Sequence, residues 1–264
     1  MALLSLPVFA DDGDVTSDAP PAKVLFVGNS FTYYNDSLHK HYRELVSASG
    51  LHTLDTARSR IMTISGGYLP EHAGGFERVL SEDDWDVVVM QGHSRGPISE
   101  DTAEPFQQAA RKFARIAREQ GTRPVFFMTW AYTDKPEMTA QLDAAYTDIG
   151  RELGAEVVPV GLAFERVTTE RPDIALRIAD AKHPSLAGTY LAACTFFAAL
   201  YEQSPEGLSY DVGLGEETAT FLQRVAWQTV KDYTQRTNKL NRRYRSGALS
   251  NNRYRFDRKA ESGG

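Results

Sequence analysis

The sequence has 264 residues, of which 42% are hydrophobic and 24% are charged, and its formal net charge is −6. This length suits one large α/β domain with a well-buried core. The acidic balance argues against nucleic acid as the main partner, because phosphate binding needs a positively charged face. No stretch approaches the ~20 apolar residues that span a bilayer, so we expect no membrane span.

The first 22 residues form a leader ahead of the predicted domain. Residues 1–10 are largely apolar, and an Asp-rich polar stretch follows them, as after the cleavage site of an export signal. The segment is short and lacks a positively charged start. It fits either the remnant of an export signal, which would place the protein in the periplasm or outside the cell, or the frayed terminus of a cytoplasmic protein.

Short apolar runs alternate with amphipathic stretches from residue 23 onward. The runs Val24–Val27, Asp86–Met90, Pro124–Met128 and Glu156–Pro159 predict strands, and helices are expected near 36–49, 100–120, 136–153, 186–202 and 215–236. This alternation predicts parallel crossovers, and strands that are apolar throughout are buried on both faces. The sequence therefore predicts one α/β domain over residues 23–236, with a three-layer, doubly wound parallel sheet of flavodoxin-like topology.

The last part of the chain has a different composition. Residues 231–264 hold ten Lys or Arg and three Asp or Glu, a local charge of +7 that leaves −13 for the rest of the chain. Arg and Tyr interleave in this region. We assign residues 237–264 to a basic C-terminal tail, which is either a solvated or self-docked segment or a surface for anionic polymers or lipids.

A serine stands where the first predicted strand ends. Ser30 follows Gly28 and Asn29, and the functional groups of a doubly wound sheet gather at the carboxyl ends of its strands. Ser30 is therefore a candidate nucleophile, although a serine at this place would also serve as a helix N-cap. The segment lacks the glycine spacing and the lysine of a phosphate loop.

A base and an orienting acid occur together late in the chain. Asp180 precedes His183 by three residues, and Pro184 disfavours a helical backbone at His183, which keeps this residue on a loop. A nucleophilic serine needs a base, and the base needs an acceptor for its other ring nitrogen. We therefore interpret Ser30, His183 and Asp180 as a candidate catalytic triad.

These two parts of the chain resemble the SGNH (GDSL-like) hydrolases. The segment Gly-Asn-Ser-Phe-Thr at residues 28–32 resembles their first block, and Asp-x-x-His-Pro-Ser-x-x-Gly at residues 180–188 resembles their last block. The resemblance extends over about residues 23–203 and implies the SGNH hydrolase fold. It also implies an oxyanion hole made by the Ser30 backbone N–H, a glycine N–H of the second block and an Asn side chain of the third.

The second and third blocks match the family less closely. Gly67, in the segment Ile-Ser-Gly-Gly-Tyr-Leu at residues 64–69, is the expected donor of the second block. The third block of the family reads Gly-x-Asn-Asp, whereas residues 91–94 read Gln-Gly-His-Ser. Either Gln91 or His93 could supply the missing donor, and we slightly favour Gln91. We interpret the difference as the mark of a divergent subfamily.

Aromatic residues accompany the predicted site. Trp130 and Tyr132 follow the fourth strand, and Tyr33 and Tyr34 follow Ser30. Such side chains can stack on a sugar ring or line an acyl pocket, and core packing explains them nearly as well. No cluster has convincing metal-ligand spacing, so we expect neither a metal nor a cofactor.

Together these features predict a serine esterase or deacylase, a carboxylic ester hydrolase that works through an acyl-Ser30 intermediate on acylated carbohydrate or small acyl esters. Two alternatives stay open. The same triad could transfer the acyl group to a sugar acceptor, because access of water decides between the two outcomes. The chain could also be a non-catalytic binding module on the same scaffold, which the missing Asn makes plausible. The sequence indicates no oligomeric state.

Overall fold

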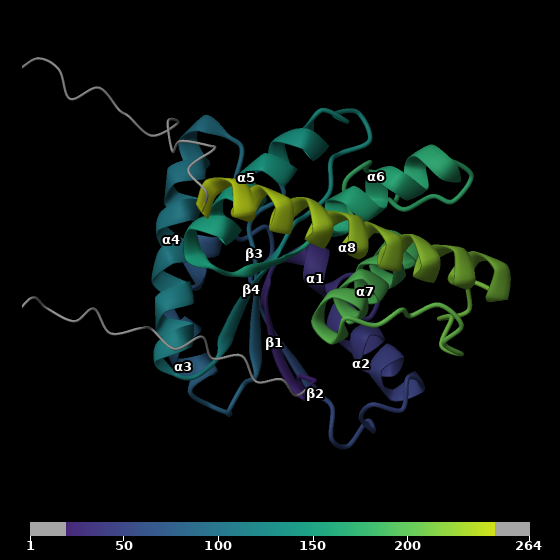
Figure 1. The fold of residues 1–264 in the computed structure, drawn as a ribbon, viewed down its shortest axis with the longest axis horizontal. Helices are drawn as coiled ribbons and strands as arrows, with labels where there is room; N and C mark the ends of the chain where they lie inside the picture. The colour runs from purple at the N-terminus through teal and green to yellow at the C-terminus, as the bar shows by residue number, and fades with distance from the viewer. Residues whose placement is uncertain (1–19, 246–264) are drawn as a thin grey trace, which may run out of the picture.

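The structure, a computed structural model, describes residues 20–245 and is built on one parallel sheet with the strand order β2-β1-β3-β4-β5 (Figure 1). The strands are β1 (Lys23–Gly28), β2 (Arg58–Thr63), β3 (Val87–Gln91), β4 (Arg123–Phe127) and β5 (Glu156–Val158). The strand order reverses between β1 and β3, which is where doubly wound folds place their functional groups. The predicted three-layer α/β architecture is confirmed.

Helices cover both faces of this sheet (Figure 1). They are α1 (Ser30–Tyr33), α2 (Leu38–Ala48), α3 (Phe76–Leu80), α4 (Glu100–Glu119), α5 (Met138–Leu153), α6 (Val160–Glu170), α7 (Leu186–Tyr201) and α8 (Glu216–Arg245), with a 3-10 helix, η1, at Leu69–Gly74. Contacts join η1, α3, α4 and α5 on one face and α2, α7 and α8 on the other. The strands β1, β3 and β4 are thereby shielded from solvent on both sides.

The core explains why these elements were visible in the sequence. Residues 24–27 of β1 and 87–91 of β3 are buried without exception, as expected for central strands of a parallel sheet. Helix α7 is apolar around its whole circumference, and its residues 187–201 are all buried between α2, α6 and α8. A helix of this kind has no solvent face and belongs to the interior.

The sequence analysis missed the short helices α1, η1 and α3 as well as β2 and α6, and one helix is longer than expected. Strand β2 is an edge strand whose residues are half-buried or exposed, so it lacks a continuous apolar run. Helix α6 directly follows β5 without a polar break. Helix α8 continues beyond residue 236 to Arg245, so the first nine residues of the basic segment are helical. Residues 1–19 of the predicted leader and residues 246–264 of the basic tail lie outside the described residues.

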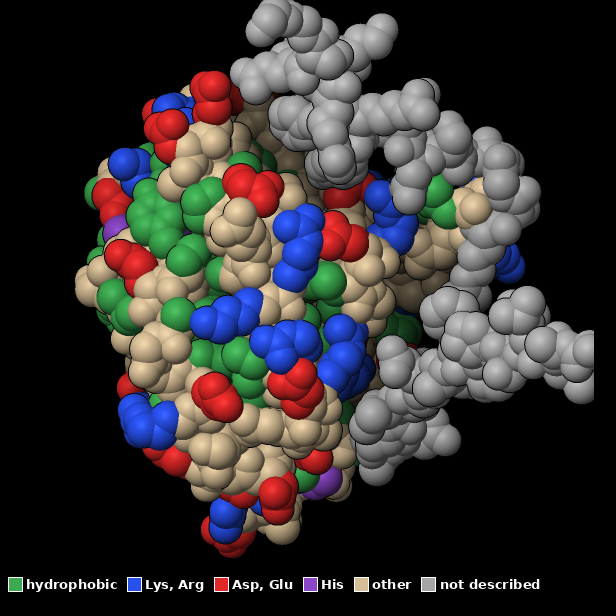
Figure 2. Space-filling view, turned by 90° about the vertical axis from the view of Figure 1, so that its left-hand side faces the viewer, with side chains coloured by type: hydrophobic (Ala, Val, Ile, Leu, Met, Phe, Trp, Pro, Cys, Tyr) green, Lys and Arg blue, Asp and Glu red, His purple; other side chains and the backbone are tan. Residues whose placement is uncertain are grey.

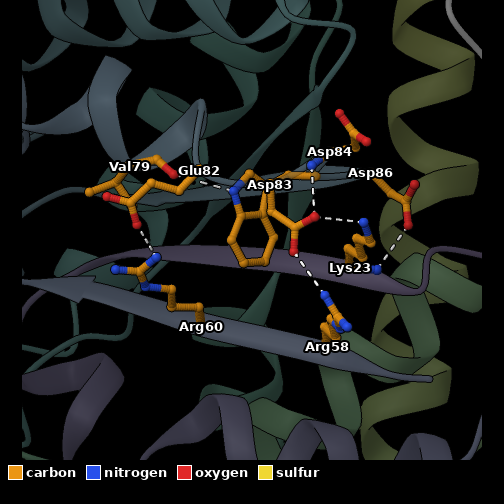
Figure 3. Close-up of polar contacts among 9 residues, drawn as sticks. Lys23, Arg58, Arg60, Val79, Glu82, Asp83, Asp84 and Asp86 are labelled. Carbon is orange, nitrogen blue, oxygen red and sulfur yellow. Dashed lines mark hydrogen bonds and ion pairs between the residues drawn. The ribbon is translucent and has the colours of Figure 1, made fainter. Parts of the chain in front are cut away.

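Charged side chains tie together the amino ends of β1, β2 and β3 (Figure 3). Asp83, in the loop before β3, accepts hydrogen bonds from Lys23 Nζ at 2.6 Å and from Arg58 Nη1 at 3.4 Å. Asp86 accepts the backbone N–H of Lys23 at 2.8 Å. These contacts fix the loop that leads into β3 against the first residue of β1.

The face of the molecule that includes α4 carries Lys and Arg side chains next to Asp and Glu side chains (Figure 2). Arg111 pairs with Glu152 at 2.5 Å and Arg115 pairs with Glu119 at 2.6 Å. The charges on this face are therefore mixed rather than separated by sign. Over residues 20–245, no helix combines the length and the apolar character needed to cross a membrane.

Candidate active site

Ser30, His183 and Asp180 lie in a hydrogen-bonded row at the carboxyl end of β1. Ser30 Oγ is 2.9 Å from His183 Nε2, and His183 Nδ1 is 2.5 Å from Asp180 Oδ2. The serine opens α1, whereas the other two residues belong to the loop before α7. The structure thus brings together the three residues that the sequence predicted, across 153 positions of the chain.

The turn between β1 and α1 presents Ser30. Asn29 is the N-cap of α1, and its Oδ1 accepts the Phe31 N–H at 3.1 Å. A Cβ at Gly28 would lie 2.5 Å from both Gln91 Oε1 and Thr32 Oγ1, so only glycine allows this close approach. The N–H of Ser30 donates to no other group of residues 20–245 and is one of the unpaired donors of a helix start.

The loop that carries the base is held by its own backbone. Ile178 N–H donates to the His183 carbonyl at 2.9 Å, and Asp180 Oδ1 accepts the N–H groups of Lys182 and His183, each at 2.9 Å. Partial burial acts to raise the pKa of Asp180, but the hydrogen bonds from the His183 ring and from these N–H groups outweigh it and lower the pKa to about 2. The ionised carboxylate keeps a hydrogen on His183 Nδ1, which leaves Nε2 free to accept from Ser30.

Aromatic rings fix the orientation of the His183 imidazole. Tyr34 stacks on it with centroids 4.4 Å apart and ring planes 9° apart, and Phe31 meets it edge-on at 5.7 Å. Phe31 in turn stacks on Trp130 at 4.3 Å. Rings of this kind also stabilise a cation above their faces, so they suit an imidazole that becomes protonated.

The glycine pair at residues 66–67 lies against Asn29. The Gly67 carbonyl accepts Asn29 Nδ2–H at 3.0 Å, whereas the Gly67 N–H already donates to the Ile64 carbonyl at 3.0 Å. Gly66 has φ +65° and an N–H that donates to nothing in the described part of the chain. The structure therefore offers Gly66 as the available donor in place of the predicted Gly67.

Gln91 is a buried side chain that holds its neighbours by hydrogen bonds and has no donor left for a ligand. It is 1% exposed, and the two hydrogens of its amide go to Asn29 Oδ1 at 2.7 Å and to the Gly92 carbonyl at 3.0 Å. Its Oε1 accepts the Thr32 hydroxyl at 2.7 Å. The predicted role of Gln91 as an oxyanion donor conflicts with this geometry, because no amide hydrogen remains.

His93 has the free donor that Gln91 lacks. Its ring stacks on Tyr68 at 4.3 Å, and Nδ1 faces the Arg95 N–H at 3.5 Å. Burial lowers the pKa of His93, which favours the neutral ring. A neutral ring that accepts at Nδ1 carries its hydrogen on Nε2. Since β1 and β3 are neighbours with Val27 opposite Met90, His93 and Ser30 follow the same edge of the sheet.

Solved structures of other proteins share this architecture. A DUF4886 family protein from Bacteroides uniformis has a TM-score of 0.63 at 20% identity, over 79% of this chain and 94% of that one. A candidate SGNH hydrolase from Slackia heliotrinireducens has a TM-score of 0.55 at 28% identity, over 65% and 94%. This chain has the SGNH hydrolase fold. The resemblance stated from the sequence is confirmed at that level.

A third neighbour with the SGNH fold is the acetyl xylan esterase AlAXEase, with a TM-score of 0.57 at 15% identity over 67% of this chain and 98% of that one. A catalytic mutant of Axe2, an acetylxylan esterase from Geobacillus stearothermophilus, reaches 0.54 at 15% identity over 68% and 94%. No protein-family model and no curated protein matches the sequence.

The aromatic residues predicted to bind substrate have different places in this SGNH fold. Trp130 is fully buried, stacks on Phe164 at 4.2 Å and donates Nε1–H to the Lys182 carbonyl at 2.9 Å, so the prediction of substrate contact is wrong for this residue. Tyr132 is largely buried, with its hydroxyl 2.6 Å from Ser94 Oγ. Trp130 supports the residue that precedes His183 instead of facing a ligand.

Tyr33 remains accessible beside the site. It is half-buried, and its hydroxyl lies 3.0 Å from Ser65 Oγ, in the segment that also contains Gly66.

Sequence reasoning missed the roles of Asn29 and Asn35 in holding the site. Asn29 replaces the Asp of the family's first block and could have been singled out for that reason, whereas no local motif marks Asn35.

A small cavity of about 200 Å³ adjoins the second block and is lined by Tyr68, Leu69, His93 and Phe106, among others. A larger one, of about 910 Å³, lies between α5, β5 and α8, and Ser30, Asp180 and His183 line neither cavity. Within residues 20–245, no group of three or more His, Cys, Asp and Glu side chains is placed to hold a metal ion.

Proposed function

We propose that this protein is a serine esterase that forms an acyl intermediate on Ser30. The row from Ser30 Oγ through His183 to Asp180, at 2.9 Å and 2.5 Å, is the observation that carries the proposal. His183 Nε2 takes the Ser30 proton as the oxygen attacks the ester carbonyl, and it then gives that proton to the leaving alcohol. In the second half, His183 takes a proton from water as the water oxygen attacks the acyl carbon, and it gives that proton to Ser30 Oγ as the bond to the acyl group breaks and the acid leaves.

The negative charge that develops on the carbonyl oxygen needs donors fixed in advance. The N–H groups of Ser30 and Gly66 are unpaired among the described residues, and His93 Nε2–H supplies the third donor in place of the family's Asn. Gln91 acts behind them, since it holds the Asn29 side chain that caps α1 and contacts the Gly67 carbonyl. These buried hydrogen bonds hold the backbone that carries the donors, so the donors keep nearly fixed positions.

The substrate we propose is a small acyl ester of a carbohydrate. Two structural neighbours are named as acetylxylan esterases, and the cavity next to His93 and Tyr68, at about 200 Å³, suits a short acyl group better than a lipid chain. Tyr33, half-buried beside the second block, offers a ring on which a sugar can stack.

Hydrolysis of p-nitrophenyl acetate by the wild type and by Ser30→Ala tests the proposal, together with mass spectrometry of a fluorophosphonate label. We expect kcat to fall by roughly 10⁴-fold or more in Ser30→Ala, with the label on Ser30 of the wild type. Ser81→Ala, which removes a hydroxyl on the exposed end of α3, is the matched control. Turnover that survives in Ser30→Ala would refute the proposal, and a new sugar ester formed when acceptor sugars are added would identify a transferase.

A further inference from the structure

Three consecutive residues after α1 have a backbone conformation that residues other than glycine seldom adopt. Asn35, Asp36 and Ser37 have φ of +52°, +63° and +78°. Asn and Asp tolerate the left-handed region better than most residues, and Ser does so less readily. Such backbone persists only where the surrounding structure fixes it, and it is concentrated at functional sites.

The Asn35 side chain joins this strained turn to the loop of the base. Its Nδ2 donates to the Pro184 carbonyl at 2.9 Å and to Thr189 Oγ1 at 2.8 Å, across 149 and 154 positions of the chain. Pro184 directly follows His183, and Thr189 lies in the first turn of α7. Both hydrogens of the Asn35 amide are therefore donated to residues 184–189, the segment that directly follows His183.

A second hydrogen-bond network fixes the backbone of Asn35 through its carbonyl oxygen. His41, which is 5% exposed, lies with Nε2 2.6 Å from the Asn35 carbonyl and with Nδ1 2.7 Å from the Tyr210 hydroxyl. A carbonyl only accepts, so His41 Nε2 carries the hydrogen and the Tyr210 hydroxyl donates to Nδ1. Ser37 Oγ also donates to the Thr32 carbonyl at 3.1 Å. The amide of Asn35 thus has a fixed direction.

We propose that Asn35 is a positioning residue for His183. It fixes the peptide that follows the base while Tyr34 stacks on the imidazole, so that Nε2 stays 2.9 Å from Ser30 Oγ. Helix α1 begins at the nucleophile, and the turn that leaves it holds the base, so one short segment sets both partners of the proton transfer. This inference rests on the proposed esterase chemistry.

The test compares Asn35→Gly with Asp36→Gly. Glycine adopts positive φ freely, so both variants keep the backbone of the turn, but only the first loses an amide that contacts the loop of the base. Asp36 is exposed and pairs with Lys40 on α2. We expect Asn35→Gly to lower kcat on p-nitrophenyl acetate by roughly 10- to 100-fold with KM within about threefold, because small displacements of a catalytic group are costly. The rate of fluorophosphonate labelling should fall in parallel.

A double-variant comparison separates positioning from a general structural role. In a His183→Ala background the base is gone, so adding Asn35→Gly should not reduce the residual rate further. An equal loss in that background, or wild-type kcat in Asn35→Gly alone, would overturn the inference. Wild-type turnover in His183→Ala would instead refute the proposed esterase chemistry. If Asn35→Gly does not fold, Asn35→Asp keeps the volume of the side chain and removes its donors.

Discussion

At the amino ends of the central strands, charged side chains meet in ion pairs, whereas at the carboxyl ends neutral hydrogen bonds and stacked rings act together with the Asp180 carboxylate. Asp83 joins Lys23 and Arg58 at the first end (Figure 3). Gln91 holds Asn29 at the other end, fully out of solvent. Half-exposed ion pairs contribute little each and can rearrange, while buried neutral networks fix one geometry. The ion pairs at the amino ends therefore contribute to stability, whereas the buried hydrogen bonds at the carboxyl ends fix the positions of the side chains near Ser30.

The residues that adopt positive φ also differ between the amino ends and the carboxyl ends of the strands. The turns that lead into the amino ends of β2, β4 and β5 use Gly50, Gly121 and Gly154 for their positive φ, with open space around each. At the carboxyl ends, positive φ falls on Gly66 and also on residues with side chains, such as Asn35 and Ala181. Strain of this kind is kept where a side chain must point in one direction.

The largest effect is expected at the carboxyl end, for Asp180→Asn. We expect kcat on p-nitrophenyl acetate to fall by roughly 10⁴-fold, because an amide no longer keeps the hydrogen on His183 Nδ1. The pKa of Asp180 is about 2, so the wild-type carboxylate is ionised across the assay range and the loss should be similar from pH 6 to 9. A rate near that of the wild type at any of these pH values would contradict the triad.

The next effect separates the two candidates for the third oxyanion donor. His93→Ala should lower kcat by roughly 10²- to 10³-fold, as expected for loss of an oxyanion donor, with little change in Tm. Gln91→Leu should lower Tm as well as kcat, because it leaves Asn29 Oδ1 without one of its buried donors. If His93→Ala keeps full kcat, the third donor lies elsewhere.

A pair of tryptophan variants compares the two ends directly. Trp130→Phe keeps the stack on Phe31 but loses the bond to the Lys182 carbonyl, which should cost about 1 kcal/mol and about 2–4 °C in Tm. Because Lys182 precedes His183, kcat should fall several-fold as well. Trp85→Phe, near the amino ends, loses a bond to the Val79 carbonyl and should lower Tm without changing kcat. Equal effects on kcat would remove the distinction between the ends.

The smallest effect is expected for Asp83→Asn. The hydrogen bond from Lys23 lowers the pKa of Asp83 below its ordinary value, so the stabilisation is present above about pH 4 and is lost as the pH falls through the lowered pKa. At pH 7 the variant should melt about 1–3 °C lower, and the difference should shrink in melts below pH 4. Its kcat should match that of the wild type, and a change in kcat would show that the two ends are coupled.

Local patterns were enough to predict most of the sheet and the three residues that meet in the row from Ser30 to Asp180. Strands β1, β3 and β4 are buried on both faces and read as apolar runs, while β2 lies at an edge and mixes Arg and Ser with its two large apolar residues. Ser30 and His183 each stand in a recognisable local context, a strand end and a proline-terminated loop. Such contexts can be recognised in the sequence without knowledge of the tertiary contacts.

The parts that failed depend on where hydrogens and rings go in three dimensions. The sequence slightly favoured Gln91 over His93 as the third donor, but in the structure the bonds to Asn29 and Gly92 use both amide hydrogens of Gln91. Trp130 looked accessible because strand ends often are, but Phe31 and Phe164 cover both faces of its ring. Asn35 contacts a residue 149 positions away, and no spacing in the sequence reveals such a pair.

The 153 positions between Ser30 and His183 affect when activity can begin during synthesis. All five strands, within residues 23–158, leave the ribosome before the loop that contains Asp180 and His183. The nascent chain can therefore form its sheet and bury most of its core while the serine still lacks a base. In the proposed mechanism, hydrolysis can begin only when residues 176–185 dock beside α1, so the appearance of activity would report the last step of folding rather than the collapse of the core.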